Sequence, residues 1–317
     1  MTIPEILPYH IEKEMSSSEK IEYYKKLREY CDSRKRQKSE KITLGQKAIS
    51  ELYLPNFYSN KLEIYGQENI PNDNNVIFVC NHSNSHDIFS MYSILNEVNI
   101  GTSVMVATDC LNPVTTAIFD AAGSTLLDRR NKEQANRSVL EMSSKILSGT
   151  SGTIFGEATW NLHPINPMQS IKIGPPRIAL LSDSVIIPTI LEYVEVPGKC
   201  NKELDLYSKV VICFGKPIEI NYNDSLELQA LKIEKEMAKI RQEIWKTYGV
   251  ERTTIENIDP EIYVNHTYLK KFKAFGFKYD SEKESQFLHF SDGKPIENEY
   301  YIDENNNFVP GIILKKH

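Results

Sequence analysis

An uninterrupted apolar run at residues 76–80 is followed directly by a polar turn at residues 81–85. Because the run lacks the alternation of a half-exposed strand, it predicts a strand buried on both faces. Apolar positions recur at helical spacing over residues 86–96, which predicts a helix. His82 is therefore expected on a strand-to-helix turn at the carboxyl end of a strand, where parallel α/β sheets collect ligands and catalytic groups.

Strand patterns and helix patterns alternate along the chain from residue 62 to residue 214. Further strands are expected at residues 62–66, 102–107, 125–127, 153–155, 185–190 and 209–214, and further helices at residues 114–121, 132–147 and 175–183. This alternation predicts an α/β fold with a mostly parallel central sheet that helices cover on both faces. A long amphipathic helix is expected to follow at residues 226–247.

The same pattern divides the chain into three parts. Residues 1–55 are expected to form an N-terminal helical segment, in which residues 16–19 offer a helix cap. Residues 56–250 are expected to form the α/β domain. Residues 251–317 are a polar C-terminal extension, in which a few short apolar stretches predict a small hairpin.

The composition is typical of a folded protein outside the membrane interior. The 317 residues are 40% hydrophobic and 25% charged, with a mean hydropathy of -0.41. No apolar stretch approaches the roughly 18–20 residues of a spanning helix, and residues 1–8 lack the pattern of a signal peptide, so a cytoplasmic protein is expected. The net charge of -6 gives no overall attraction to nucleic acid. The five cysteines are scattered without a C-x-x-C pair, which favours free thiols and no zinc site.

The segment from Lys20 to Lys41 is rich in lysine and arginine and contains Tyr23, Tyr24 and Tyr30. One interpretation is a solvated helix whose positive charges are balanced by nearby acids. The other is a membrane-surface element, because aromatic rings beside basic residues suit the lipid headgroup region. The pattern leaves both open.

Four short blocks at the ends of predicted strands carry the candidate chemistry. They are residues 81–87 (N-H-S-N-S-H-D), 123–129 (G-S-T-L-L-D-R), 155–159 (F-G-E-A-T) and 185–189 (V-I-I-P-T). A G-x-S-x-G nucleophile elbow, a G-x-G-x-x-G motif and a P-loop are absent from the sequence. Serine-hydrolase and nucleotide-dependent chemistry therefore have no support.

His82 and Asp87 are the candidate catalytic pair. An imidazole held by a carboxylate through one nitrogen is a general base at the other, because the carboxylate fixes the tautomer and stabilises the imidazolium. No Ser or Cys nucleophile is placed beside the pair, so a substrate hydroxyl is the expected proton source. Arg129 can bind a phosphate on that substrate, and Glu157 can orient groups near the site. A metal site that uses His86 as well is disfavoured, because no further ligand cluster follows.

The four blocks, in this order, resemble the glycerolipid acyltransferase superfamily, most closely its lysophosphatidic-acid acyltransferase branch with the signature N-H-x-x-x-x-D. The resemblance covers roughly residues 60–220. It implies that His82 takes the proton of an acceptor hydroxyl while Asp87 holds His82, and that the acceptor oxygen attacks the thioester of acyl-CoA or acyl-carrier protein directly. It implies no covalent acyl-enzyme, no metal and no cofactor.

The resemblance also implies roles for other residues. Glu157 matches the acid of the third block and is expected in the catalytic set with His82 and Asp87. Pro188 matches the proline of the fourth block, which shapes the sheet. The residues expected to bind substrate are Asn81, Arg129, Thr159 and Lys172.

The third block departs from the family pattern F-P-E-G-T-R. Gly156, Ala158 and Trp160 stand in place of its proline, glycine and arginine. Loss of the arginine removes a phosphate contact and permits an acceptor with less phosphate. The candidate replacements for that contact are Arg129, Arg130 and Lys172.

Three functional hypotheses follow. The first is acyl transfer to a glycerol-phosphate-type acceptor such as lysophosphatidic acid. The second keeps the mechanism and changes the acceptor to a sugar, amino acid or other small alcohol or amine. The third is a non-catalytic lipid-binding protein. For the first, the expected partners are acyl-CoA or acyl-carrier protein, a lipid acceptor and, transiently, the inner face of the membrane, with no nucleic acid.

Overall fold

The computed structural model describes residues 4–34, 42–57, 62–72, 75–82, 86–108, 111–158, 167–194 and 209–249, and four short strands beyond residue 289. The helices are α1 (Tyr9–Glu14), α2 (Ser17–Ser33), α3 (Leu44–Phe57), α4 (Asp87–Glu97), α5 (Pro113–Ala121), α6 (Lys132–Leu147), α7 (Gly174–Ser182) and α8 (Leu226–Thr247), with a 3-10 turn η1 (Gln67–Asn69). The strands of the main sheet are β1 (Leu62–Tyr65), β2 (Val76–Cys80), β3 (Thr102–Ala107), β4 (Thr125–Leu127), β5 (Ser151–Phe155), β6 (Val185–Val194) and β7 (Lys209–Phe214).

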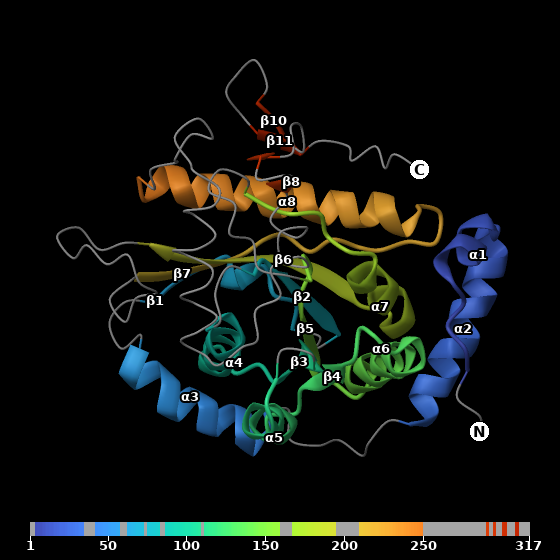
Figure 1. The fold of residues 1–317 in the computed structure, drawn as a ribbon, viewed down its shortest axis with the longest axis horizontal. Helices are drawn as coiled ribbons and strands as arrows, with labels where there is room; N and C mark the ends of the chain where they lie inside the picture. Colours follow the sequence, from blue (N-terminus) through green and yellow to red (C-terminus); the bar gives the residue numbers. More distant parts are fainter. Residues whose placement is uncertain are drawn as a thin grey trace.

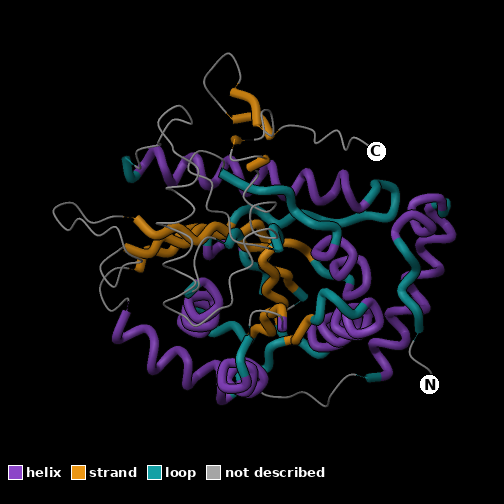
Figure 2. The backbone as a smooth tube through the Cα atoms, in the orientation of Figure 1, coloured by secondary structure: helices purple, strands orange, loops and turns teal. Residues whose placement is uncertain are grey.

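The seven strands form one sheet in the order β1-β7-β6-β2-β5-β3-β4. Strands β6, β2, β5, β3 and β4 are parallel, whereas β7 is antiparallel to β6 and β1 is parallel to β7. The prediction of a mostly parallel sheet is therefore confirmed. Figure 2 shows the strands as a layer between helices.

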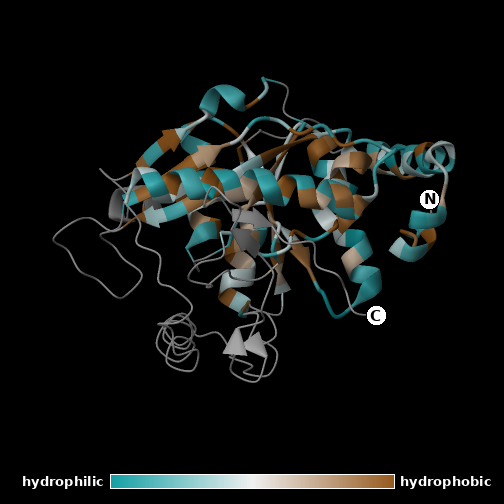
Figure 3. Ribbon diagram, turned by 90° about the horizontal axis from the view of Figure 1, so that it is seen from above, coloured by the Kyte–Doolittle hydropathy of each residue, from teal (hydrophilic) through white to brown (hydrophobic). Residues whose placement is uncertain are grey.

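Helices cover both faces of this sheet, as predicted (Figure 1). Alternate residues of β2 point to opposite sides, so Phe78 packs with α3, α4 and α5, whereas Ile77 and Val79 pack with α6, α7 and α8. All five residues of β2 are buried, as expected for a central parallel strand. Figure 3 shows hydrophilic and hydrophobic positions alternating along α8, whose apolar side faces the sheet.

The N-terminal helix α2 packs against the outer surface of α6 and α7. Ser16 and Glu19 form a capping box that fixes its first turn. Tyr24 and Tyr30 are buried in this contact, so these two rings are not available to lipid headgroups. No helix in the described ranges is both long enough and apolar enough to cross a membrane.

Two antiparallel strand pairs lie in the C-terminal extension. Strand β8 (Phe290–Ser291) pairs with β9 (Lys294–Pro295), and β10 (Tyr300–Ile302) pairs with β11 (Phe308–Pro310). The rest of residues 251–317 lies outside the described residues, and the three-part division of the chain stays a prediction.

Candidate active site

The His82 imidazole and the Asp87 carboxylate are in direct contact. His82 follows the end of β2, and Asp87 is the first residue of α4, so its carboxylate also lies at the favourable N-terminal end of a helix. Nδ1 of His82 lies 2.8 Å from Oδ2 of Asp87. The Asp87 side chain is fully buried, whereas that of His82 is 15% exposed. Asp87 is therefore shielded from solvent, whereas part of the His82 side chain is accessible to a substrate.

The imidazole is held on a second side by Phe155 at the end of β5. The two rings stack with centroids 4.4 Å apart and an angle of 28° between their planes. Since Nδ1 faces a carboxylate, the neutral ring carries its proton there and its lone pair on Nε2. Nε2 is thus the basic atom of the pair.

Glu157 positions the backbone around His82. Its Oε2 accepts a hydrogen bond from the His82 backbone N–H at 2.8 Å, and its Oε1 accepts one from the Gln169 N–H at 2.7 Å. The residue is fully buried. These two main-chain hydrogen bonds give Glu157 a positioning role, and its place in the catalytic set stays a prediction.

The Asn81 side chain binds the backbone of a neighbouring strand, and its expected contact with substrate stays a prediction. Its side-chain Nδ2 donates to the Leu191 carbonyl at 3.0 Å, and its Oδ1 accepts from the Leu191 N–H at 2.8 Å. Asn81 is fully buried. Its amide therefore joins the end of β2 to β6 and holds the residue before His82.

The second and third blocks meet beside the pair. The Arg129 guanidinium, after β4, donates to the Ala158 carbonyl at 2.8 Å. Ala158 has a φ of 59°, in the left-handed region where a glycine is favoured, and the family pattern has a glycine there. Lys172 is exposed, and its backbone N–H donates to the Gly156 carbonyl at 2.9 Å. Thr159 and Trp160 lie outside the described residues.

The structure explains the glycine that replaces the family's proline. A Cβ atom at Gly156 would lie 2.7 Å from Cγ1 of Val79 and 2.8 Å from Cδ1 of Ile171. Both neighbours belong to the core beneath the site. Close packing therefore excludes a larger residue at this position unless these side chains move.

Two comparisons with known proteins found a similarity. Residues 61–192 match the family model Acyltransferase. This match lies within the part of the chain that resembles the glycerolipid acyltransferase superfamily. Among solved structures, that of the 1-acyl-sn-glycerophosphate (LPA) acyltransferase PlsC from Thermotoga maritima is similar, with a TM-score of 0.46 and 16% identity over 77% of this chain and 88% of that chain. None of the curated proteins matches this sequence significantly.

A buried arginine on α8, Arg241, was not among the candidate residues expected from the sequence. Arg241 of α8 donates through Nε to Oε2 of Glu192 at 2.6 Å and through NH1 to the Pro167 carbonyl at 2.7 Å. Trp245 donates to the same Glu192 oxygen at 3.1 Å. Burial lowers the pKa of Arg241, but the charge of Glu192 and its hydrogen bonds outweigh burial and raise that pKa overall.

A second side chain of α8, that of Glu234, binds the same segment of backbone as Arg241. Glu234 accepts a hydrogen bond from the Ile171 N–H at 3.1 Å. The segment 167–171 is thus held by Arg241, Glu157 and Glu234 in turn. In the sequence, the only indication of these contacts was that Glu234 and Arg241 fall on the apolar side of the helical pattern at residues 226–247.

The described residues hold no group of three or more His, Cys, Asp or Glu side chains that could bind a metal ion. His86, the third candidate ligand, precedes α4. Burial lowers the pKa of His86, and the nearby Asp87 charge only partly opposes this.

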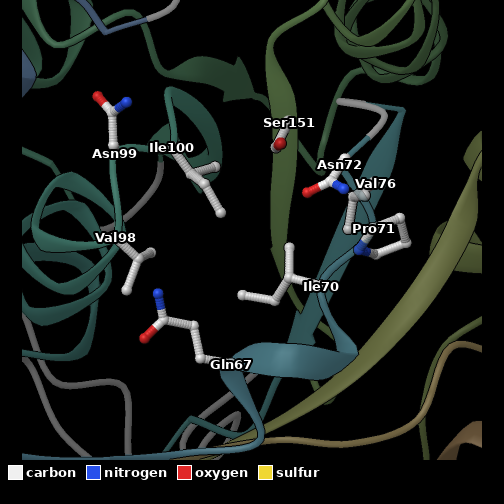
Figure 4. Close-up of a pocket in the computed structure, with 9 residues that line it drawn as sticks. All are labelled: Gln67, Ile70, Pro71, Asn72, Val76, Val98, Asn99, Ile100 and Ser151. Atoms are coloured by element: carbon white, nitrogen blue, oxygen red, sulfur yellow. The ribbon is translucent and has the colours of Figure 1, made fainter.

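A separate cavity of about 320 Å³ lies at the other edge of the sheet, near the starts of β2 and β5 (Figure 4). Its lining includes Val76, Ile100 and Ser151, with Asn72 and Gln67, and every lining residue is neutral. His82 lies at the carboxyl end of β2, so this cavity is separate from the His82–Asp87 pair.

Proposed function

We propose that the domain moves a fatty acyl group from a thioester, acyl-CoA or acyl-carrier protein, to a hydroxyl of a glycerol-phosphate-type lipid such as lysophosphatidic acid. The contact of the partly exposed His82 side chain with buried Asp87 is the observation that carries this proposal. The family match supports acyl transfer, and the two residues supply a base for it.

The proposed reaction needs one base and no metal or other cofactor. Nε2 of His82 takes the proton of the acceptor hydroxyl as its oxygen attacks the thioester carbonyl. The C–S bond then breaks, and the thiolate takes the proton back from the imidazolium. Asp87 stabilises the imidazolium while it exists. Glu157 and Asn81 hold the backbone on either side of His82, which keeps the base in place.

Arg129 is the proposed contact for an acceptor phosphate. Replacing Arg129 with Gln is expected to raise KM for lysophosphatidic acid about tenfold or more, since a hydrogen bond to a charged group contributes about 1.5–3 kcal/mol. Acylation of unphosphorylated acceptors should change less than twofold. Steady-state release of free CoA with each acceptor measures both values.

Arg137→Gln is a matched control, because this arginine is exposed on α6 and pairs only with Glu133 in the described part of the chain. Equal losses for Arg129→Gln on phosphorylated and unphosphorylated acceptors would refute the phosphate contact and indicate that Arg129 serves only to hold Ala158.

A sugar, amino acid or other small alcohol or amine is an alternative acceptor in this proposal, because Trp160 stands where the family pattern has an arginine. A sugar or amine acceptor that outperforms lysophosphatidic acid in the same assay would favour it. Binding of acyl-CoA without turnover of any acceptor would favour the lipid-binding hypothesis.

The proposal includes contact with a membrane surface, because a lipid acceptor resides in a membrane. Co-sedimentation of the full chain with anionic liposomes tests it, and absence of the protein from the pellet at low salt would count against it.

A further inference from the structure

The buried Asp87 carboxylate has a second hydrogen-bond partner besides His82. The hydroxyl of Tyr193 lies 2.8 Å from Oδ1 of Asp87, while Oδ2 faces His82. Asp87 has no exposed surface. A buried carboxylate oxygen without a donor is costly, and the contact with Tyr193 gives Oδ1 of Asp87 a donor.

The direction of this hydrogen bond follows from the chemistry of the two groups. An ionised carboxylate has no proton, so the Tyr193 O–H must be the donor. Ser90 lies on the other side of the phenol, with Oγ 3.1 Å from the Tyr193 oxygen. The single proton of the Ser90 hydroxyl can be donated either to the Tyr193 oxygen or to the carbonyl of His86, the residue before α4, which lies 3.0 Å away. The phenol is thus held between α4 and the carboxylate.

Strand β6 places the Tyr193 side chain next to the His82–Asp87 pair. The backbone of Leu191 is held by Asn81, the residue before His82. The next side chain, Glu192, points to the opposite face of the sheet and is held by Arg241. Tyr193 follows on the α4 face. Leu191, Glu192 and Tyr193 are successive residues of β6. The contacts of Leu191 and Glu192 hold the strand in the position that places the Tyr193 phenol next to Asp87.

The other ionisable groups around Asp87 come from three elements. His82 and Cys80 belong to β2 and the turn after it, His86 precedes α4, and Arg241 belongs to α8. Burial raises the pKa of Cys80, and the Asp87 charge adds to this. Asp87 is among the carboxylates whose charge favours the charged form of Arg241. Among the described residues, Tyr193 is the neutral donor in direct contact with Oδ1 of Asp87.

We propose that Tyr193 is a positioning residue of the proposed acyl-transfer site, which acts through Asp87 by fixing the plane of its carboxylate and thereby the orientation of the His82 imidazole. This inference rests on the proposed function. The Tyr193 hydroxyl binds Oδ1 while Oδ2 contacts the imidazole, so the carboxylate is held at both oxygens.

Tyr193→Phe tests the proposal, with Tyr92→Phe as the control. Tyr92 is also a buried tyrosine in the α4 layer, but its hydroxyl contacts Ser124 instead of the pair. Tyr193→Phe is expected to lower kcat about tenfold with KM within twofold, because a general base that is less well oriented takes the acceptor proton more slowly. Tyr92→Phe should lower stability and leave both kinetic quantities near wild type.

A proton NMR signature separates this inference from the proposed function. The Nδ1 proton of His82 is identified as the downfield resonance that is absent in His82→Ala. It should shift or broaden in Tyr193→Phe and remain in place in Tyr92→Phe, whether or not an acceptor has been found. If Tyr193→Phe matches Tyr92→Phe in this resonance, and in kcat where turnover exists, the proposal is wrong. Absence of turnover in wild type would instead refute the proposed function.

Discussion

Replacing Asp87 with Asn is expected to lower kcat for acyl transfer by a factor on the order of 10⁴, by analogy with the same change in Ser-His-Asp enzymes. The amide is nearly the same shape as the carboxylate, so the fold should be retained. Its NH₂ group would donate to Nδ1 of His82, which moves the ring proton to Nε2. The atom that must accept the acceptor's proton would then carry one already.

Steady-state kinetics and thermal unfolding of the purified variant measure this prediction. Asp120→Asn on α5 is the control, because Asp120 is exposed and lies on the outer helix layer. If Asp87→Asn kept more than a tenth of the wild-type kcat, the tautomer argument would fail and His82 would have to act in another way.

Replacing Arg241 with Met is expected to cost about 3–5 kcal/mol of unfolding free energy, the largest stability effect foreseen for this chain. The methionine fills much of the same volume, but it leaves the buried charge of Glu192 uncompensated and the Pro167 carbonyl without its donor. The Glu192 side chain is only 12% exposed, so water cannot replace the lost partner fully. Urea unfolding of both proteins gives the difference.

The double variant Arg241→Met, Glu192→Leu is the informative control. With both charges removed, a large part of the lost free energy should return, because no buried ion remains without a partner. A double variant no more stable than Arg241→Met alone would show that the cost lies in packing around α8, and a single-variant loss below about 1 kcal/mol would contradict the role of the ion pair.

Much of the fold could be predicted from apolar spacing. The ranges expected for β3, β4, β7, α6 and α8 coincide with those observed. In each of these elements the spacing of the apolar residues follows from which face of the element is buried, so the sequence pattern marks its ends. The direction of β7 could not be predicted, since an apolar strand looks the same whether its neighbour runs parallel or antiparallel. The end of β6 was placed at residue 190 and lies at Val194, because the pattern becomes polar at Glu192.

The site was predictable in part. The spacing of His82 and Asp87 indicated the pair that the structure brings into contact. The contacts of Asn81 with Leu191, and of Glu157 with His82 and Gln169, depend on which strand ends are neighbours in the sheet, which no local pattern records. The resemblance implies a catalytic role for Glu157 and a substrate contact for Asn81, and both stay predictions. Tyr193 and Arg241 lay outside every motif, and their partners are 106 and 49 positions away.

The most direct test of the account is the release of free CoA from palmitoyl-CoA by wild type and His82→Ala side by side. The acceptors are glycerol 3-phosphate, lysophosphatidic acid and a set of unphosphorylated alcohols and amines, and acyl-carrier protein replaces CoA in a repeat. The expected result is turnover of at least one acceptor by wild type, reduced about 10²–10⁴-fold in His82→Ala, as for loss of a general base. Equal turnover by both proteins, or none by wild type with either carrier, would contradict the assignment of His82 as the base of an acyltransferase.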